Sequence, residues 1–156
     1  MPVLNRRSLV LGAFAAAVAP SPSRAGSLPR VVATKDPSCG CCASWVEHMR
    51  AAGFPVEVVE VAHVDRVKAR LGVPRELASC HTAEVGGYVL EGHVPAAEVK
   101  RLLTERPQGR GLAVPGMPTG SPGMEMEGMA PDTYDVVLFG PTGRRVFARY
   151  EGTRPL

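Results

Sequence analysis

The sequence RVVATKDPSCGCCASWVEHMRAAG, residues 30–53, runs from an apolar segment through a cysteine-rich turn into a longer mixed segment. Residues 30–34 predict a short buried strand, which leads into the turn at 35–40. A helix is expected from about Cys41 to Ala52, because Gly53 is a typical stop signal. This stretch therefore predicts a strand–turn–helix unit with cysteines clustered where the helix begins.

The rest of the chain alternates between strand and helix patterns. Further strands are expected at 55–61 and 88–90, helices at 64–71 and 95–106, and a hairpin at 134–150. Residues 107–132 form a long loop rich in Gly, Pro and Met, a type that is usually functional or disordered. The order predicts a single α/β domain with a central mixed sheet flanked by helices. A Cys-x-x-Cys pair between the first strand and the first helix points to a thioredoxin-like fold.

Residues 1–25 have the features of a cleavable export signal rather than of a domain. Arg6 and Arg7 precede an uncharged stretch of about twelve residues, too short to span a bilayer or to act as a stable membrane anchor. The paired arginines favour the twin-arginine route over the general secretory route, and small residues predict cleavage after Ala25. We therefore expect residues 26–156 to work in the periplasm, where unprotected thiols oxidise.

The charge of the chain belongs to this signal. The 156 residues carry 18 Lys and Arg against 15 Asp and Glu, and three of the arginines lie in residues 1–25, which contain no acid. The remaining chain has a formal charge of zero and no basic run interleaved with aromatics. This composition argues against nucleic acid or an anionic membrane as the main partner.

All cysteines fall in two short motifs, Cys39-Gly-Cys41-Cys42 and Cys80-His81. A helix start stabilises thiolates, which improves them as ligands and nucleophiles. Such crowding suits a soft metal better than a simple dithiol switch, because adjacent cysteines form only a strained disulfide. In a thioredoxin-like fold the Cys80 segment faces the start of the first helix, so the two motifs should meet. The site would then combine thiolates with an imidazole.

The identity of the metal follows from ligand softness and compartment. Paired zinc knuckles and ferredoxin spacings are missing, whereas thioethers and thiolates both suit Cu(I). Four methionines lie within the long loop at 117, 124, 126 and 129. Met117 is favoured as a ligand because prolines and a glycine fix its surroundings, and the role of the other three stays open. Copper is therefore the expected metal.

The other histidines are weaker candidates. His48 is expected to be a surface or packing residue, and His63 a helix cap or a solvent-exposed residue. His93 precedes the helix at 95–106, and it either approaches the site or only turns the chain. Its role is left open.

Several motifs in order resemble the CopG-like family of exported copper-resistance proteins, long catalogued as a domain of unknown function. They are Pro37-Ser-Cys-Gly-Cys-Cys-Ala-Ser-Trp-Val46, Leu71-Gly-Val-Pro-Arg-Glu-Leu-Ala-Ser-Cys-His-Thr82, Gly87-Tyr-Val-Leu-Glu-Gly-His-Val-Pro95 and Gly111-Leu-Ala-Val-Pro-Gly-Met-Pro118 with Gly120-Ser-Pro-Gly-Met-Glu125. The resemblance implies a thioredoxin-like domain with a copper cluster bridged by Cys39, Cys41, Cys42 and Cys80, with His81 nearby and Met117 in contact.

The leading hypothesis is a periplasmic copper-binding protein of copper resistance that holds several Cu(I) ions. Interconversion of Cu(I) and Cu(II) at this site would make it a copper oxidoreductase. Its expected partners are copper ions and other periplasmic copper-handling proteins. One alternative is a thiol–disulfide oxidoreductase that acts through Cys39 and Cys42, against which stands the lack of any proline between Pro74 and Pro95. A second alternative is a binding module stapled by disulfides, without metal.

Overall fold

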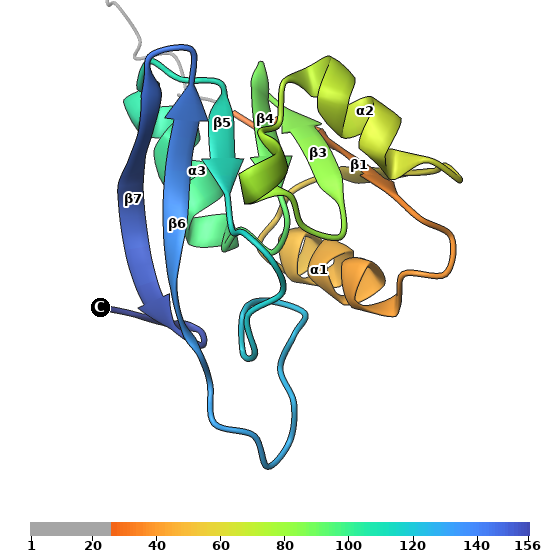
Figure 1. Ribbon diagram of the computed structural model, residues 1–156, viewed down its shortest axis with the longest axis vertical. Coiled ribbons are helices and arrows are strands. Elements are labelled where there is room, and N and C mark those ends of the chain that lie inside the picture. The colour runs from red at the N-terminus through yellow and green to blue at the C-terminus, as the bar shows by residue number, and fades with distance from the viewer. Residues whose placement is uncertain (1–25) are drawn as a thin grey trace, which may run out of the picture.

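The computed structural model describes residues 26–156 (Figure 1), so the predicted export signal lies outside the described residues. The strands are β1 (Val31–Lys35), β2 (Val56–Glu60), β3 (Thr82–Val85), β4 (Tyr88–Glu91), β5 (Gly111–Ala113), β6 (Thr133–Gly140), β7 (Gly143–Glu151) and β8 (Arg154–Pro155). The helices are α1 (Gly40–Ala51), α2 (Val64–Leu71) and α3 (Ala96–Glu105), with a 3-10 turn, η1, at Arg75–Leu77. The three predicted helices are confirmed to within a residue or so at each end.

The strands within residues 26–156 form one mixed sheet in the order β2-β1-β3-β4-β5-β6-β7-β8. Strands β1 and β2 pair in parallel, as do β4 and β5, and the other neighbours are antiparallel. The predicted α/β domain with a central mixed sheet is therefore confirmed. The more specific thioredoxin-like assignment stays a prediction.

Each face of the sheet has its own apolar cluster. On one face α1 and α3 contribute Trp45, Met49 and Leu102, which pack with strand residues such as Leu90. The smaller cluster on the other face joins Leu71, at the end of α2, to residues of η1, β4, β5 and β6. Truncating a side chain as buried as Trp45 to alanine typically costs about 3–5 kcal/mol of stability. The sheet and the helices packed on its two faces thus hold in place the segments that follow the strand ends.

Strand β3 is absent from the predicted elements, and the structure shows why the chain turns there. Gly86 and Gly87 connect β3 to β4 with φ values of 54° and 89°. Two consecutive residues with positive φ form the tight turn that suits the twist of a β-hairpin, and glycine adopts this conformation without strain. The hairpin register pairs Thr82 with Glu91, so the residues just outside that pair lie next to each other.

The prediction of a loop without secondary structure at 107–132 is wrong in part, because β5 lies within it. A Cβ on Gly111 would stand 1.7 Å from the carbonyl oxygen of Val89, so only glycine lets β5 lie so close to β4. The segment after β5 leaves the sheet and returns as β6 (Figure 1). The predicted C-terminal hairpin is confirmed as β6 and β7, and β8 extends it.

None of the helices in the described part is long and apolar enough to cross a membrane.

Candidate metal centre

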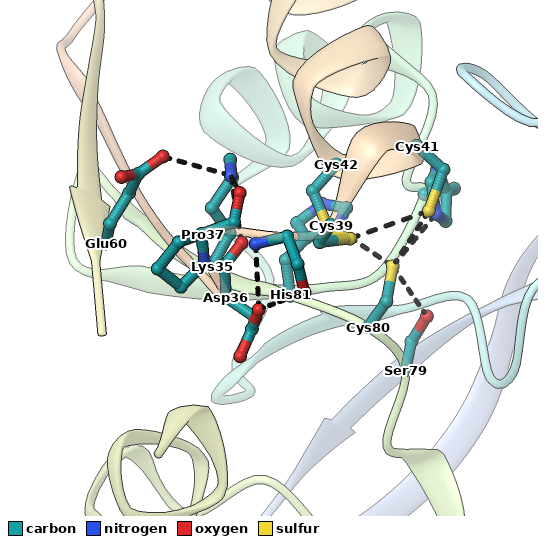
Figure 2. Close-up of a disulfide and its surroundings, with 12 residues drawn as sticks. Lys35, Asp36, Pro37, Cys39, Cys41, Cys42, Glu60, Ser79, Cys80 and His81 are labelled. Atoms are coloured by element: carbon teal, nitrogen blue, oxygen red, sulfur yellow. Dashed lines mark hydrogen bonds and ion pairs between the residues drawn. A yellow bond between two sulfur atoms is a disulfide. The ribbon is translucent and has the colours of Figure 1, made fainter. Parts of the chain in front are cut away.

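Three of the four cysteines lie at the first turn of α1. Cys39 is the residue before the helix and caps it without a side-chain hydrogen bond, so its sulfur is not engaged with the backbone. Cys39 and Cys42 form a disulfide with their Cα atoms 5.5 Å apart, and Cys41 is free. Figure 2 shows these sulfurs at the helix end, facing Cys80. Helix geometry therefore presents the three sulfurs together.

Cys80, from the segment before β3, completes this group. Its sulfur lies 3.9 Å from that of Cys41, which in turn lies 3.6 Å from the sulfur of Cys39. The four Sγ atoms all lie within 4.8 Å of one another. Four soft donors this close can share soft metal ions. The structure thus brings together the two cysteine motifs that were expected to meet.

Cys80 also belongs to a second group, with His81 and His93. The Cys80 sulfur lies 3.3 Å from Nδ1 of His81 and 3.0 Å from Nε2 of His93. Both rings are almost fully buried. His93, whose role the sequence left open, is brought into the site because the β3–β4 register places the chain before β3 beside the chain after β4. The signal that could have found it is the Gly86–Gly87 pair, a typical hairpin turn.

The surroundings keep both imidazoles neutral. Burial is the main cause that lowers the pKa of His93 and holds that of His81 well below its usual range, with the nearby His93 and Lys68 adding to the effect on His81. Nδ1 of His93 lies 2.8 Å from the carbonyl oxygen of Pro122 and must donate to it. The other nitrogen, Nε2, then carries a lone pair directed at Cys80, which is the form that binds metals. Nε2 of His81 has no hydrogen-bond partner among the described residues.

The thiol of Cys80 is protonated when the site holds no metal. Burial, and next the neighbouring Cys41, raise the pKa of the Cys80 thiol to about 11. A metal ion would replace this proton, because the thiolate is the ligand. Metal binding at Cys80 therefore releases a proton and weakens as the pH falls.

A buried ion pair supports the Cys80 segment from the side of the sheet. Nζ of Lys68, in α2, lies 2.5 Å from Oε1 of Glu91. The same oxygen accepts a hydrogen bond from the Ser79 amide at 2.7 Å. Both charged side chains are nearly fully buried. The Ser79 hydroxyl donates to the carbonyl oxygen of Gly116. The backbone just before Cys80 is therefore held by α2, β4 and the segment after β5.

The segment between β5 and β6 closes the site on another side. A Cβ on Gly123 would stand 2.6 Å from the amide nitrogen of Trp45 and 3.0 Å from the carbonyl oxygen of Cys41, and its φ is +86°. Only glycine allows this approach of the segment to α1. Met117 directly follows Gly116, whose carbonyl oxygen accepts the hydrogen bond from Ser79. Met117 itself is 55% exposed. The predicted ligand is thus near the rim of the site rather than packed inside it.

His48 and His63, the weaker histidine candidates of the sequence, lie outside both groups of donors. Nε2 of His48 accepts a hydrogen bond from the Ala96 amide at 3.0 Å, a packing role that joins α1 to α3. His63 is the residue before α2 but makes no capping hydrogen bond with its side chain.

The mixed sheet and the two groups of sulfur and nitrogen donors define an α/β protein with a candidate soft-metal site. A family model described as "Protein of unknown function, DUF411" matches residues 77–124. Two solved structures are similar, each with a TM-score of 0.74. One, named copper resistance protein CopG form 2, is 44% identical, and the match covers 79% of this chain and 98% of the CopG chain. The other, form 1, is 45% identical and covers 80% and 99%. No curated protein matches the chain. At this identity and coverage, the chain belongs to the CopG family.

Proposed function

We propose that the protein binds copper in copper resistance, and that it holds Cu(I) in a cluster bridged by Cys39, Cys41, Cys42 and Cys80. The observation that carries the proposal is the approach of the four sulfurs to within 4.8 Å of one another. Thiolates are the ligands that Cu(I) prefers. The name of the related structures, copper resistance protein CopG, supports copper over other soft metals.

The cluster holds several ions, because one set of donors does not account for all the sulfur and nitrogen atoms present. Cys80 is common to the all-sulfur group and to the group with His81 and His93. A sulfur shared in this way bridges ions in the two groups. Met117 completes the ligand set from the rim, where its exposed thioether can turn toward the cluster.

Copper loading depends on the redox state of the Cys39–Cys42 pair. Its disulfide offers no thiolate, so a reductant must first deliver two electrons and two protons to give two thiols. Conversely, oxidation of two bound Cu(I) ions to Cu(II) releases two electrons, which dioxygen or a partner protein must accept. Interconversion of Cu(I) and Cu(II) at this site is therefore coupled to an external electron partner.

The protein acts in the periplasm in this proposal. Residues 1–25 direct export, with cleavage near Ala25, and residues 26–156 form the copper-binding domain. Other periplasmic copper-handling proteins then supply or receive the ion.

Copper counting tests this function. The mature chain is reduced, loaded with Cu(I) without oxygen, desalted, and its copper measured per chain. We expect more than one ion per chain, and background copper in a variant with all four cysteines changed to serine. Equal copper in the two proteins would overturn the proposal. Circular dichroism of both proteins shows whether the variant keeps its fold.

The Cys39–Cys42 disulfide also favours a second candidate, a thiol–disulfide oxidoreductase. The test is catalysis of insulin reduction by the metal-free protein. Turnover that survives Cys80→Ser and His81→Ala would support this candidate, because neither residue belongs to the disulfide.

A further inference from the structure

The methionines of the segment between β5 and β6 differ from a packing methionine. Met49 of α1 is fully buried and fills the core, as methionine commonly does. Met126 and Met129, in contrast, are 52% and 54% exposed. The cyan-to-blue segment that carries them extends beyond the end of the sheet (Figure 1). Their thioethers therefore contribute little to packing and are open to solvent.

The backbone brings these two residues close together. The Met129 amide donates to the carbonyl oxygen of Met126 at 3.3 Å, and Gly128 between them has a φ of 77°. This turn draws together residues that are three apart in the chain. Both residues line one hollow of about 370 Å³, which Glu125, Glu151 and Arg154 also line.

The charges around this hollow favour a cation. Arg154 pairs with Glu151, so these two charges offset each other. None of the ion pairs within residues 26–156 includes Glu125. Its Oε2 accepts a hydrogen bond from the Gly123 amide at 2.8 Å, so the carboxylate keeps its negative charge and its other oxygen. Two soft, neutral donors beside a carboxylate without an ion-pair partner suit a soft monovalent cation.

We propose that Met126 and Met129 form a second metal site, which binds Cu(I) reversibly at the surface with Glu125 supplying negative charge. The site is separate from the cysteine cluster and shares no ligand with it. Neutral thioethers hold the ion without losing a proton, so it can leave again.

The same segment connects this thioether site to the cluster. Pro122 accepts a hydrogen bond from His93, whose ring contacts Cys80, and Gly123 packs on the first turn of α1. Met126 follows three residues after Gly123. If the cluster binds copper as proposed above, the thioether site is placed to pass Cu(I) to it. Copper keeps its oxidation state in this transfer, and the receiving thiols release their protons to solvent.

Nuclear magnetic resonance with Ag(I), a redox-inert soft monovalent cation, tests the site directly. The mature chain carries five methionines, and their methyl groups are labelled with carbon-13. Met126→Leu and Met129→Leu variants assign the two signals. After the thiols are saturated, we expect further Ag(I) to shift the Met126 and Met129 methyl signals together, while the buried Met49 signal stays in place. No movement of the two signals would overturn the proposal.

The transfer step needs a second measurement. A Met126→Leu/Met129→Leu variant should reach the same final number of copper ions in the cysteine cluster as the unchanged chain, but more slowly. Equal loading rates would overturn the transfer while leaving the Ag(I) result to decide the site. Absence of copper in the unchanged chain would overturn the proposed function instead, and the methyl shifts would still report on the thioether site.

Discussion

Sulfur donors occur in two regions of this molecule, and the fold holds them in different ways. The cysteines lie where a helix start meets a strand start, with Cys42 almost fully buried and Cys80 held by a buried ion pair behind it. The thioethers of Met126 and Met129 stand on a segment outside the sheet and are more than half exposed. The sheet and helices thus fix the positions of the thiols, whereas local turns fix those of the thioethers. Changes to the core should therefore affect the cluster, whereas changes to Met126 and Met129 should leave the fold intact.

The largest effect is expected from breaking the ion pair behind Cys80. Lys68→Met leaves the carboxylate of Glu91 buried without its cation, which typically costs about 3–5 kcal/mol. Urea unfolding of the metal-free protein measures this loss. The control is Lys68→Met with Glu91→Gln, which removes both charges and keeps an acceptor for the Ser79 amide. If the double variant is no more stable than the single one, the ion pair is not what supports this region.

The same carboxyl makes stability depend on pH. Burial raises the pKa of Glu91 above its usual value of 4.5, although Lys68 acts against this shift. The folded chain then holds this proton more readily than the unfolded chain does. The stabilisation from the protonated form is therefore fully present below the usual pKa of 4.5 and is lost as the pH rises through the raised pKa of the folded chain. Glu91→Gln should flatten this part of the unfolding free energy against pH, and an unchanged slope would contradict the shift.

Removing the shared thiol is expected to have the next largest effect. Cys80→Ser takes a donor from both groups of the metal centre, and we expect Cu(I) affinity to fall by about 100-fold, or about 2.8 kcal/mol. Competition with a coloured Cu(I) chelator measures it. Stability without metal should change far less than in the Lys68 variant. Unchanged affinity would show that the cluster forms within 39–42 alone.

A smaller effect is expected at His93. Its Nε2 lies 3.0 Å from the Cys80 sulfur and its Nδ1–H donates to Pro122, so His93→Gln should lower Cu(I) affinity by about tenfold. The loss is smaller than for Cys80→Ser because His93 belongs to one group of donors and Cys80 to both. His48→Gln is the control, because His48 is half-buried and accepts its hydrogen bond from the Ala96 amide, away from the sulfurs. Equal losses in the two variants would contradict a role of His93 in the site.

Met117→Leu should have the smallest effect. The side chain is exposed, so the free energy of unfolding should change by no more than about 0.5 kcal/mol. Cu(I) affinity should fall less than it does in His93→Gln, because the thioether lies at the rim. A loss as large as that of Cys80→Ser would place Met117 among the principal ligands.

Local patterns predicted the elements that local forces determine. The helices at 64–71 and 95–106 carry clear apolar periodicity and stop signals, and the structure has them within a residue of those bounds. Strands β3 and β5 were missed because each is short and lacks a run of β-branched residues; pairing with β1, β4 and β6 makes them strands. The prediction of a loop at 107–132 was wrong at β5 for the same reason.

The candidate site was predictable where its residues are unusual in sequence and not where only folding joins them. The clustered cysteines are conspicuous in the sequence. Cys80-His81 could be assigned to the same site because it also combines metal-ligand side chains. His93 has no such neighbour in sequence, and it reaches Cys80 through the register of the β3–β4 hairpin. Lys68 and Glu91 likewise look like ordinary surface residues until α2 is placed against the sheet.

Cys41 and Cys80, whose sulfurs lie close together, are 39 residues apart in the chain. A metal ion held between their sulfurs joins α1 to the start of β3, and it acts as a crosslink that exists only in the folded molecule. At a free ion concentration of about 100 times the dissociation constant, such binding adds about 2.7 kcal/mol to the folded state. Loaded molecules would then resist proteases that cut unfolded chains, while empty ones would be cleared sooner. The lifetime of the protein itself would report how much metal is present.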